Sequence, residues 1–585
     1  MKFSLFIVLI ITITILSISK SLNFSLAGDD WAALYYYHLK FDSFLSLFQI
    51  SHYLGIYDFS FILIGTIEKF FGLNPFIYYL ISMIIRIVSA ISFYPAVLSL
   101  TKDKKAAYLS CILFAFTYAG IESTNWVFNM TTYISLGLFN LFLWQYFTHI
   151  SKQSLKSLAL ESFFIFLSFY ATLKRMAPIL IIHPIIEILS LKKFNFISLT
   201  KRCLRIILLL SPIVIFHLIT ATASDKSYIS LIPQLSFNNF NIIFYFFSNI
   251  GSALIPDRVL QVVLPSLSTP GIKSLGSFIQ QSLLVAIFFA ILVYLLSLSL
   301  LRKTYYLVSA YSLIVIYSLI FFISLQGSSI NQFGNSLVFL NTLIGGYFVI
   351  IFSLYFIKLK DSFPYLYRAG IFSIFSSLLF LIPSWLAFNG SYPSDHRYLL
   401  IPTAFLMISI SVIATALLKQ ENKSLKTLSN LVIPIIIIMN SLSLQSYFNM
   451  YLSQGRKADY ADKLFTQIQN DENYSYNNKP LVFLFTTDNP FKLYNSITFG
   501  FPYHSILTNK KFGLDIQKAP FVVDNFESLV NVISSENSSE LKRYGYKPVK
   551  IPIENVYFYK FENDRLTNVT KEGRESLTKE LSILK

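Results

Sequence analysis

Long apolar runs dominate the pattern of hydrophobic and polar positions along this chain. Residues 3–19, 278–301 and 428–449 contain no Asp, Glu, Lys or Arg. A helix crosses a hydrocarbon layer of about 30 Å in about 20 residues, so each run is long enough to span a membrane. The pattern predicts an all-α polytopic membrane protein with about 13 transmembrane helices. Their expected positions are 3–20, 75–99, 106–120, 128–148, 157–172, 176–191, 204–222, 279–301, 305–324, 336–357, 369–388, 397–418 and 427–449.

Charges in the short connections between these runs orient the predicted helices. With the N-terminus inside, the cytoplasmic connections contain many Lys and Arg residues but only three acidic ones, Asp103, Asp361 and Glu421. Such an excess of Lys and Arg marks the cytoplasmic side. We therefore expect a multi-pass protein of the plasma (inner) membrane with a cytoplasmic N-terminus and an extracytoplasmic C-terminus. Residues 25–27 (Ser-Leu-Ala) resemble a signal-peptidase site, but the long apolar run and Lys20 favour a retained first helix.

Three longer polar stretches fall on the expected outer side: loop 21–74, loop 223–278 and everything after residue 450. The first loop is rich in aromatic residues such as Trp31 and Tyr35, a pattern typical of a helix lying among lipid headgroups. The second loop contains an apolar and aromatic run, residues 240–247, which favours a lid over a membrane-surface site.

After residue 450 the apolar runs shorten to strand length. Leu481–Phe485 and Val556–Phe561 indicate β-strands, and Glu527–Ser534 and Ser576–Leu584 indicate helices. We expect a small extracytoplasmic α/β domain over residues 451–585, following a multi-span membrane domain over residues 1–450.

The composition agrees with a membrane protein and argues against a nucleic-acid-binding protein and a disulfide-linked protein. Over 585 residues, 54% are hydrophobic and 13% charged, and the mean hydropathy is +0.58. The net charge of +17 is spread over the connections rather than gathered in one soluble patch, so we expect no nucleic-acid partner. Cys111 and Cys203 lie in or beside apolar segments on the expected cytoplasmic side, which argues against a disulfide. Glu161, Glu187 and Arg86 lie within apolar segments, where ionised groups usually have partners or mark a pathway. The alternative is a position near a span end with access to water, which is the simpler explanation for Glu187.

The most informative short stretch is the acidic pair Asp29-Asp30, directly after the first apolar run. One interpretation is a solvated turn with a helix N-cap, because Asp accepts hydrogen bonds from free amide groups at a helix start. The other is a general base or cation ligand, since a carboxylate beside lipid can have the raised pKa that proton transfer uses. The residues alone leave both open.

At this pair the chain resembles the GT-C superfamily of integral-membrane glycosyltransferases, which take sugars from polyprenyl-phosphate carriers and include mannosyl- and arabinosyltransferase-like families of bacteria. The resemblance rests on the first span, the outer loop that opens with Asp29-Asp30, the segment 55–79, the many further spans and the C-terminal outer region. It implies a GT-C-like catalytic domain over residues 1–450 in which Asp29 or Asp30 activates the acceptor hydroxyl. Many relatives have an Arg-Pro pair where this chain reads His-Tyr-Leu-Gly-Ile-Tyr-Asp at 52–58, which leaves the substrate open.

Basic residues on the expected outer side run against the orientation bias, which suggests a use. Lys174-Arg175 lies in a tight turn between spans, and His396-Arg397 begins another span. Arg and Lys suit contacts to phosphate, so we predict that these residues bind substrate. The alternative is a local ion pair, for example between Arg397 and Asp395.

Glu122 and Trp126 occupy the second outer turn and complete the predicted substrate site. An exposed turn without a role is the alternative. Because basic side chains can stabilise a departing monophosphate, we predict no required metal, although the acidic pair with Glu122 would suit Mg²⁺ or Mn²⁺.

Together these features predict an inverting transfer of a sugar from a polyprenyl-phosphate donor to a glycan, lipid or protein acceptor at the extracytoplasmic face. The partners would then be this donor, the acceptor and membrane lipids. A transporter or lipid-carrier flippase would share the spans and intramembrane charges, and a non-catalytic envelope assembly factor would share the C-terminal domain. No internal repeat is evident, and the polar features gather at the outer surface, which favours the transferase over the transporter.

Overall fold

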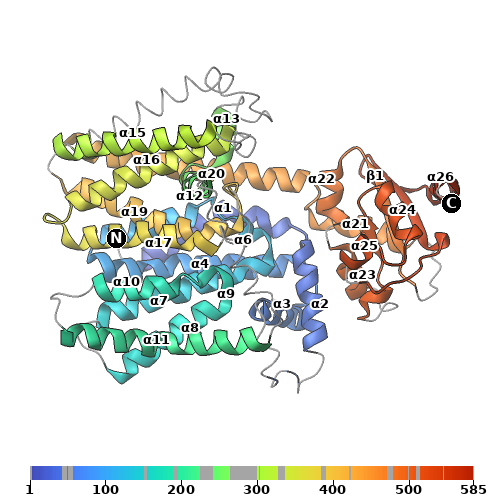
Figure 1. Cartoon of the computed structure of the whole chain (residues 1–585), viewed down its shortest axis with the longest axis horizontal. Helices are drawn as coiled ribbons and strands as arrows, with labels where there is room; N and C mark the ends of the chain where they lie inside the picture. Colours follow the sequence, from blue (N-terminus) through green and yellow to red (C-terminus); the bar gives the residue numbers. More distant parts are fainter. Residues whose placement is uncertain are drawn as a thin grey trace.

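The computed structural model shows a bundle of helices and, beyond one end of it, a smaller α/β region (Figure 1). It describes residues 3–41, 46, 49, 57–149, 154–189, 196–223, 241–263, 300–301, 304–326, 336–383, 391–420, 423–470, 479–498, 500–508, 514–543 and 546–583. Helix α20 runs from the bundle toward the α/β region and joins the two parts (Figure 1).

Helices occupy every predicted span that falls within the described residues. Their bounds are α1 Phe3–Ile18, α4 Pro75–Thr101, α5 Lys104–Phe116, α7 Thr131–His149, α8 Leu155–Ala171, α10 Ile179–Leu189, α11 Phe196–Ala223, α15 Thr304–Gln326, α16 Ser336–Lys358, α17 Pro364–Phe380, α19 Leu400–Lys419 and α20 Lys423–Ser453. Of the described helices, six are long and apolar enough to cross a membrane, namely α1, α4, α7, α16, α19 and α20. The predicted number of about 13 spans is thus not established, and the span predicted at 279–301 lies almost wholly outside the described residues.

Helix α19 forms the centre of the bundle. Its residues 400–417 are all buried, and the helix packs on α5, α7, α12 (Asn241–Leu254), α17 and α20. The outer helices instead expose large apolar side chains, with Leu16 of α1 71% and Leu442 of α20 63% exposed. Such outward-facing apolar surface is unfavourable in water and is expected where the surroundings are lipid.

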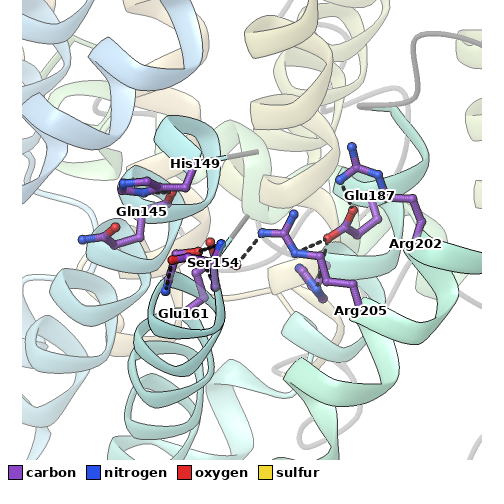
Figure 2. A network of polar contacts seen from close by, with 9 residues as sticks. Gln145, His149, Ser154, Glu161, Glu187, Arg202 and Arg205 are labelled. Carbon is purple, nitrogen blue, oxygen red and sulfur yellow. Dashed lines mark hydrogen bonds and ion pairs between the residues drawn. The ribbon is translucent and has the colours of Figure 1, made fainter. Parts of the chain in front are cut away.

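Ionised side chains inside the bundle link α8, α10 and α11 (Figure 2). Arg205 pairs with Glu161, and its Nε lies 3.2 Å from Glu187 Oε1. Arg202 Nη1 lies 2.7 Å from Glu187 Oε2. Glu161 therefore has a partner, as expected, and Glu187, for which contact with water at a span end is the simpler expectation, is instead buried and paired. Arg86 of α4 is also paired, since its Nη2 donates to the backbone oxygens of residues 115 and 117.

The first predicted outer loop contains two helices, α2 (Gly28–Lys40) and α3 (Asp58–Phe71), which pack on each other. Both lie at the end of the bundle that faces the α/β region (Figure 1). The aromatic residues of α2 do not simply line a membrane boundary as the sequence predicts. Trp31 and Tyr35 are buried, because helix α23 (Phe501–Thr508) of the α/β region packs on this face of α2.

The second predicted outer loop also differs from the sequence prediction. Its aromatic run, expected to form a lid, continues into α12, which packs along α16. Phe244 is buried in a cluster with Phe321 and Phe339. Burial against neighbouring helices satisfies the apolar side chains of this run, so the described part of it is a packed helix. A short helix, α13 (Asp257–Val263), follows, and residues 224–240 and 264–278 lie outside the described residues.

The C-terminal region is built on a four-stranded sheet of order β2-β1-β3-β4. Its strands are β1 Val482–Thr487, β2 Phe521–Val523, β3 Val556–Glu562 and β4 Arg565–Asn568, with β1 parallel to β2 and β3 and with β4 antiparallel to β3. Alternate side chains of β1 enter opposite cores: Phe483 packs with α21 (Ala458–Gln469) and α23, and Val482 packs with α24 (Phe526–Ser534), α25 (Ser539–Arg543) and α26 (Thr570–Ile583). The two strands and two helices predicted from the sequence are confirmed.

Candidate active site

The acidic pair lies in the first turn of α2, where free backbone N–H groups favour carboxylates. Asp30 is fully buried, and both of its oxygens are used. Oδ2 accepts a hydrogen bond from the Ala27 N–H at 2.8 Å, and Oδ1 accepts one from the Phe128 N–H at 2.7 Å. Burial raises the pKa of Asp30 to about 6 despite these two hydrogen bonds. Its contacts are those of a group that fixes the start of α2 against residue 128.

Asp29 has a different environment from its neighbour. It is partly exposed, and among the described residues no hydrogen bond or ion pair engages its carboxylate. Burial raises its pKa, and the charge of Arg397 lowers it in part. Asp29 is therefore the member of the pair that is free to accept a proton from another molecule.

Arg397, at the start of the turn η7 (Arg397–Leu399), faces the second outer turn. Its backbone N–H and its Nη1 lie 3.2 and 3.3 Å from Glu122 Oε2, and its guanidinium lies 4.5 Å from the centre of the Trp126 ring. Burial first, and then Asp395, raise the pKa of Glu122 to about 7, although Arg397 lowers it. The alternative expectation of an ion pair for Arg397 is therefore met, but the partner that the structure describes is Glu122 and not Asp395.

Arg175, in the short helix α9 (Leu173–Met176), approaches the same place. Its Nη1 donates to Thr132, and its Nη2 donates to Asn129 Oδ1 at 2.6 Å. The ring of Tyr398 lies 4.9 Å from this guanidinium and 5.5 Å from that of Arg397, so one aromatic ring contacts both cations. Burial lowers the pKa of Arg175 to about 10, which still leaves it charged at neutral pH. The side chain of its neighbour Lys174 lies outside the described part of the chain.

His396 is near these cations but is not one of them. Its ring stacks on Tyr392 with centroids 4.3 Å apart, and its Nδ1 accepts from the Tyr398 N–H at 3.4 Å. Burial, together with the charges of Arg397 and Arg175, lowers the pKa of His396 to about 3. At neutral pH it is a neutral ring, which suits packing and hydrogen bonding rather than charge neutralisation.

Sequence reasoning missed the residues that hold the 391–396 segment in place. Asp257 Oδ2 accepts from the Ser394 N–H at 2.7 Å, and Asn341 Nδ2 donates to Asp257 Oδ1 at 2.8 Å. The adjacent Arg258 donates from Nε to the Tyr118 hydroxyl at 2.7 Å. The charged pair 257–258 after a proline in an apolar loop is the one signal that could have drawn attention to them.

Arg456, three residues after the end of α20, links the start of the C-terminal region to the segment that precedes the acidic pair. Its Nη2 donates to the Ser25 and Asn125 backbone oxygens and to the Tyr79 hydroxyl at 2.8–3.1 Å. Lys457 forms an isolated antiparallel bridge with Phe24. The backbone that precedes the acidic pair is thus tied to the start of the α/β region.

Helix α23 brings the α/β region directly onto the first turn of α2. His504 lies edge-on to Trp31 with ring centroids 4.5 Å apart. Gly500 has a φ of +92°, and a Cβ built there would lie 2.6 Å from the Gly28 Cα. Any side chain at position 500 would force this contact apart. Glycine therefore allows the backbone of residue 500 to approach the backbone of Gly28.

The predicted site residues thus fall into one neighbourhood. Asp29, Glu122, Trp126, Arg175, His396 and Arg397 come together from four separate segments, whereas Asp30 is buried beside them with both of its oxygens hydrogen-bonded. In the described part of the chain, no three His, Cys, Asp or Glu side chains are placed to hold a metal ion.

Neither a protein-family model nor a curated protein matches the chain. Among solved structures it is similar to the oligosaccharyltransferase AglB from Archaeoglobus fulgidus in complex with an inhibitory peptide and a dolichol-phosphate, with 12% identity over 95% of this chain and 69% of that one and a TM-score of 0.44. Two further structures from the same organism match at 13% identity and 95% coverage of this chain. One is the oligosaccharyltransferase complex with Zn and sulfate, covered to 67% with a TM-score of 0.41. The other is tethered with an acceptor peptide containing the NVT sequon, covered to 68% with a TM-score of 0.37.

These neighbours are glycosyltransferases, the class of enzyme that the sequence resemblance named. Because every TM-score is below 0.5, the roles proposed below rest on the side chains of this chain alone.

Proposed function

We propose that this protein is a membrane glycosyltransferase that moves a sugar from a polyprenyl-phosphate donor to an acceptor hydroxyl at the end of the bundle where α2 lies. One observation carries the proposal: Asp29, whose carboxylate makes no hydrogen bond or ion pair within the described residues, lies near enough to Arg397, at the edge of an apolar bundle, for that cation to lower its pKa in part. The charge-predicted topology makes this the extracytoplasmic face.

The proposed reaction assigns one role to each charged group. Asp29 accepts the proton of the acceptor hydroxyl while the hydroxyl oxygen bonds to the anomeric carbon. The bond from that carbon to the phosphate oxygen breaks, and the polyprenyl phosphate leaves with the electron pair. Arg397 and Arg175 stabilise the charge that develops on the phosphate. Attack opposite the leaving group inverts the anomeric carbon and needs no covalent enzyme intermediate.

Five further residues have proposed roles around this reaction. Asp30 holds the start of α2, so that Asp29 keeps its position. Glu122 and Trp126 hold the Arg397 guanidinium by an ion pair and by ring contact. Lys174 is a further proposed phosphate contact from the same turn as Arg175. His396, as a neutral ring, is proposed to contact the sugar rather than the phosphate.

The test uses purified protein in lipid nanodiscs, an acceptor extract and a panel of radiolabelled polyprenyl-phosphate sugars. Wild type should transfer one sugar, and Asp29→Asn should lose transfer while keeping the donor affinity. Asp361→Asn is the matched control, since Asp361 is an exposed carboxylate between α16 and α17. No turnover with any donor, together with movement of labelled carrier lipid between leaflets, would replace the transferase with the flippase.

A further inference from the structure

A strip of aromatic side chains begins beside the acidic pair and is not used by the proposed chemistry. It consists of Tyr36, Tyr57, Phe61, Phe128 and Tyr503, which we call the aromatic strip. Tyr36 stacks on Phe61 with ring centroids 5.6 Å apart, and Phe61 lies 6.0 Å from Phe128. Tyr57 lies 5.3 Å from Phe128, and Tyr503 lies 6.2 Å from Tyr36.

The aromatic strip is open to solvent in part, although its rings touch one another. Tyr36 is 41% exposed and Tyr57 is 45% exposed, while the other three rings are half-buried. Single exposed apolar residues are common, whereas a contiguous row of part-exposed rings is typical of an interaction site. Two of these five rings lie on α2, which carries the acidic pair, and on α23, which packs on it.

The strip is continuous with the proposed active site. The backbone N–H of Phe128 bonds to Asp30, and Tyr36 lies two turns after Asp29 on the same side of α2. Helix α23, which carries Tyr503, packs on α2, and its preceding Gly500 approaches Gly28, the residue before Asp29. Burial raises the pKa of Tyr503, with a smaller contribution from the charge of Asp29. A ligand on the strip would therefore reach Asp29 with one end.

The charged groups around the aromatic strip indicate which class of ligand it can bind. Lys40 pairs with the buried carboxylate Asp58, and its Nζ lies 5.7 Å from the centre of the Phe61 ring. An acyl chain laid over the strip would meet the part-exposed ammonium of Lys40, which is unfavourable for a hydrocarbon. A sugar ring has an apolar C–H face bordered by hydroxyls, so it can cover an aromatic ring while its edges bond to charged and hydroxyl groups.

We propose that the acceptor is a carbohydrate chain whose sugar rings lie on the aromatic strip and whose terminal hydroxyl is presented to Asp29. The proposal rests on the transferase function above and names its acceptor class. The α/β region takes part directly, because Tyr503 is one of the five rings. From Asp29 to Tyr36 the helix rises about 10 Å, which leaves room for more than one sugar ring. Oligosaccharides should therefore bind more tightly than monosaccharides.

The experiment measures binding of full-length protein in nanodiscs to immobilised linear oligosaccharides of glucose, galactose, mannose and N-acetylglucosamine, from one to six units. We expect affinity for at least one series, increasing with chain length. Tyr36→Ala and Tyr57→Ala should each raise Kd between about 3-fold and 10-fold, the range expected for loss of one ring contact. Tyr36→Phe should stay near wild type, because it keeps the ring.

Controls separate this proposal from the proposed function. Tyr365→Ala removes a tyrosine that is 51% exposed at the start of α17 and should leave binding unchanged. Asp29→Asn should bind oligosaccharide normally while transferring nothing. Wild-type protein that transfers sugar but binds no oligosaccharide would overturn the carbohydrate acceptor and leave the transferase standing. Equal binding by wild type, Tyr36→Ala and Tyr57→Ala, with normal thermal midpoints, would also overturn it. Binding on the strip without any turnover would retain the strip and overturn the transferase.

Discussion

The carboxylate of Asp30 accepts a hydrogen bond from the backbone N–H of Phe128 at 2.7 Å. This contact joins the start of α2 to η4 (Val127–Met130), which precedes α7. It distinguishes two neighbouring acidic residues by their contacts, because both Asp30 oxygens accept backbone hydrogen bonds while Asp29 has no described partner. Proton transfer requires a base that is held at a fixed distance from the acceptor hydroxyl by a rigid scaffold.

Substitution of the two aspartates should therefore give opposite results. Asp29→Asn should reduce sugar transfer by about 10²–10⁴-fold, because it removes the base, and it should leave the thermal midpoint unchanged. Asp30→Asn should lower the free energy of unfolding by about 1–3 kcal/mol, because an amide cannot replace both accepted hydrogen bonds. Differential scanning fluorimetry and a transfer assay test both. A stable Asp30→Asn protein without transfer, beside an active Asp29→Asn protein, would reverse the assignment.

The rate of transfer should depend on pH through Asp29. A base works only when deprotonated, so the rate should rise with pH as the Asp29 carboxyl loses its proton. Burial raises the pKa of Asp29, and Arg397 lowers it in part. Arg397→Gln removes that positive charge and should move the rising limb to higher pH, whereas Arg397→Lys should keep the limb near its wild-type position. A limb that stays in place in Arg397→Gln would show that another group titrates.

The apolar spans could be predicted from the sequence because their signal is local. A run of about 20 apolar residues is sufficient for a membrane helix, and the alternation in β1 and β3 is equally local. The sequence also predicts that Asp29, Glu122 and Arg397 lie at span ends on the outer side. It could not show that Arg397 pairs with Glu122 rather than Asp395, because 275 residues separate the partners.

Other features depended on packing that no local pattern encodes. The aromatic rings of α2 resemble a membrane-boundary helix, yet Trp31 is buried by His504 from the C-terminal region. The sequence of residues 240–247 predicts a lid, but in the structure this run belongs to α12, which packs along α16. In both places the sequence shows that the segment is apolar, but it does not show which helix covers it.

Stability should fall as pH rises through the range in which Glu122 titrates. Burial raises the pKa of Glu122 from 4.5 to about 7, so the folded state binds its proton more tightly than the unfolded state. Raising the pH through this window therefore costs stability, up to about 3 kcal/mol. The thermal midpoint of wild type should fall between about pH 5 and 7, and Glu122→Gln should show a smaller fall. Parallel slopes for the two proteins would contradict the assignment.

Gly500→Ala should loosen the α/β region from α2. A Cβ at this position would lie 2.6 Å from the Gly28 Cα, and the φ of +92° is itself strained for alanine. Gly72 is the matched control, because it has a φ of +67° but nothing within 4 Å of a built Cβ. Gly500→Ala should lose more stability than Gly72→Ala and should speed proteolysis of the connection after α20. Equal effects would mean that the contact with Gly28 contributes little.

The ion-pair network of Figure 2 should govern stability but not chemistry. Glu187 faces Arg202 and Arg205, so Glu187→Gln would leave buried cations with less compensating charge, at a cost of about 3–5 kcal/mol. Asp564→Asn breaks the exposed pair with Lys492 and should cost less than about 1 kcal/mol.

Helix α7 separates this network from the proposed site. Near its start, Thr132 accepts a hydrogen bond from Arg175 of the proposed site. At its other end lies His149, one of the residues of the network in Figure 2. The 19 residues of α7 correspond to about 28 Å. Transfer per folded molecule should therefore stay at the wild-type rate in Glu187→Gln, while the unfolding midpoint falls. A further Arg202→Gln change should recover part of the lost stability, because it removes one uncompensated cation. If Glu187→Gln instead abolished transfer at full stability, the network would belong to the functional cycle, as a flippase would require.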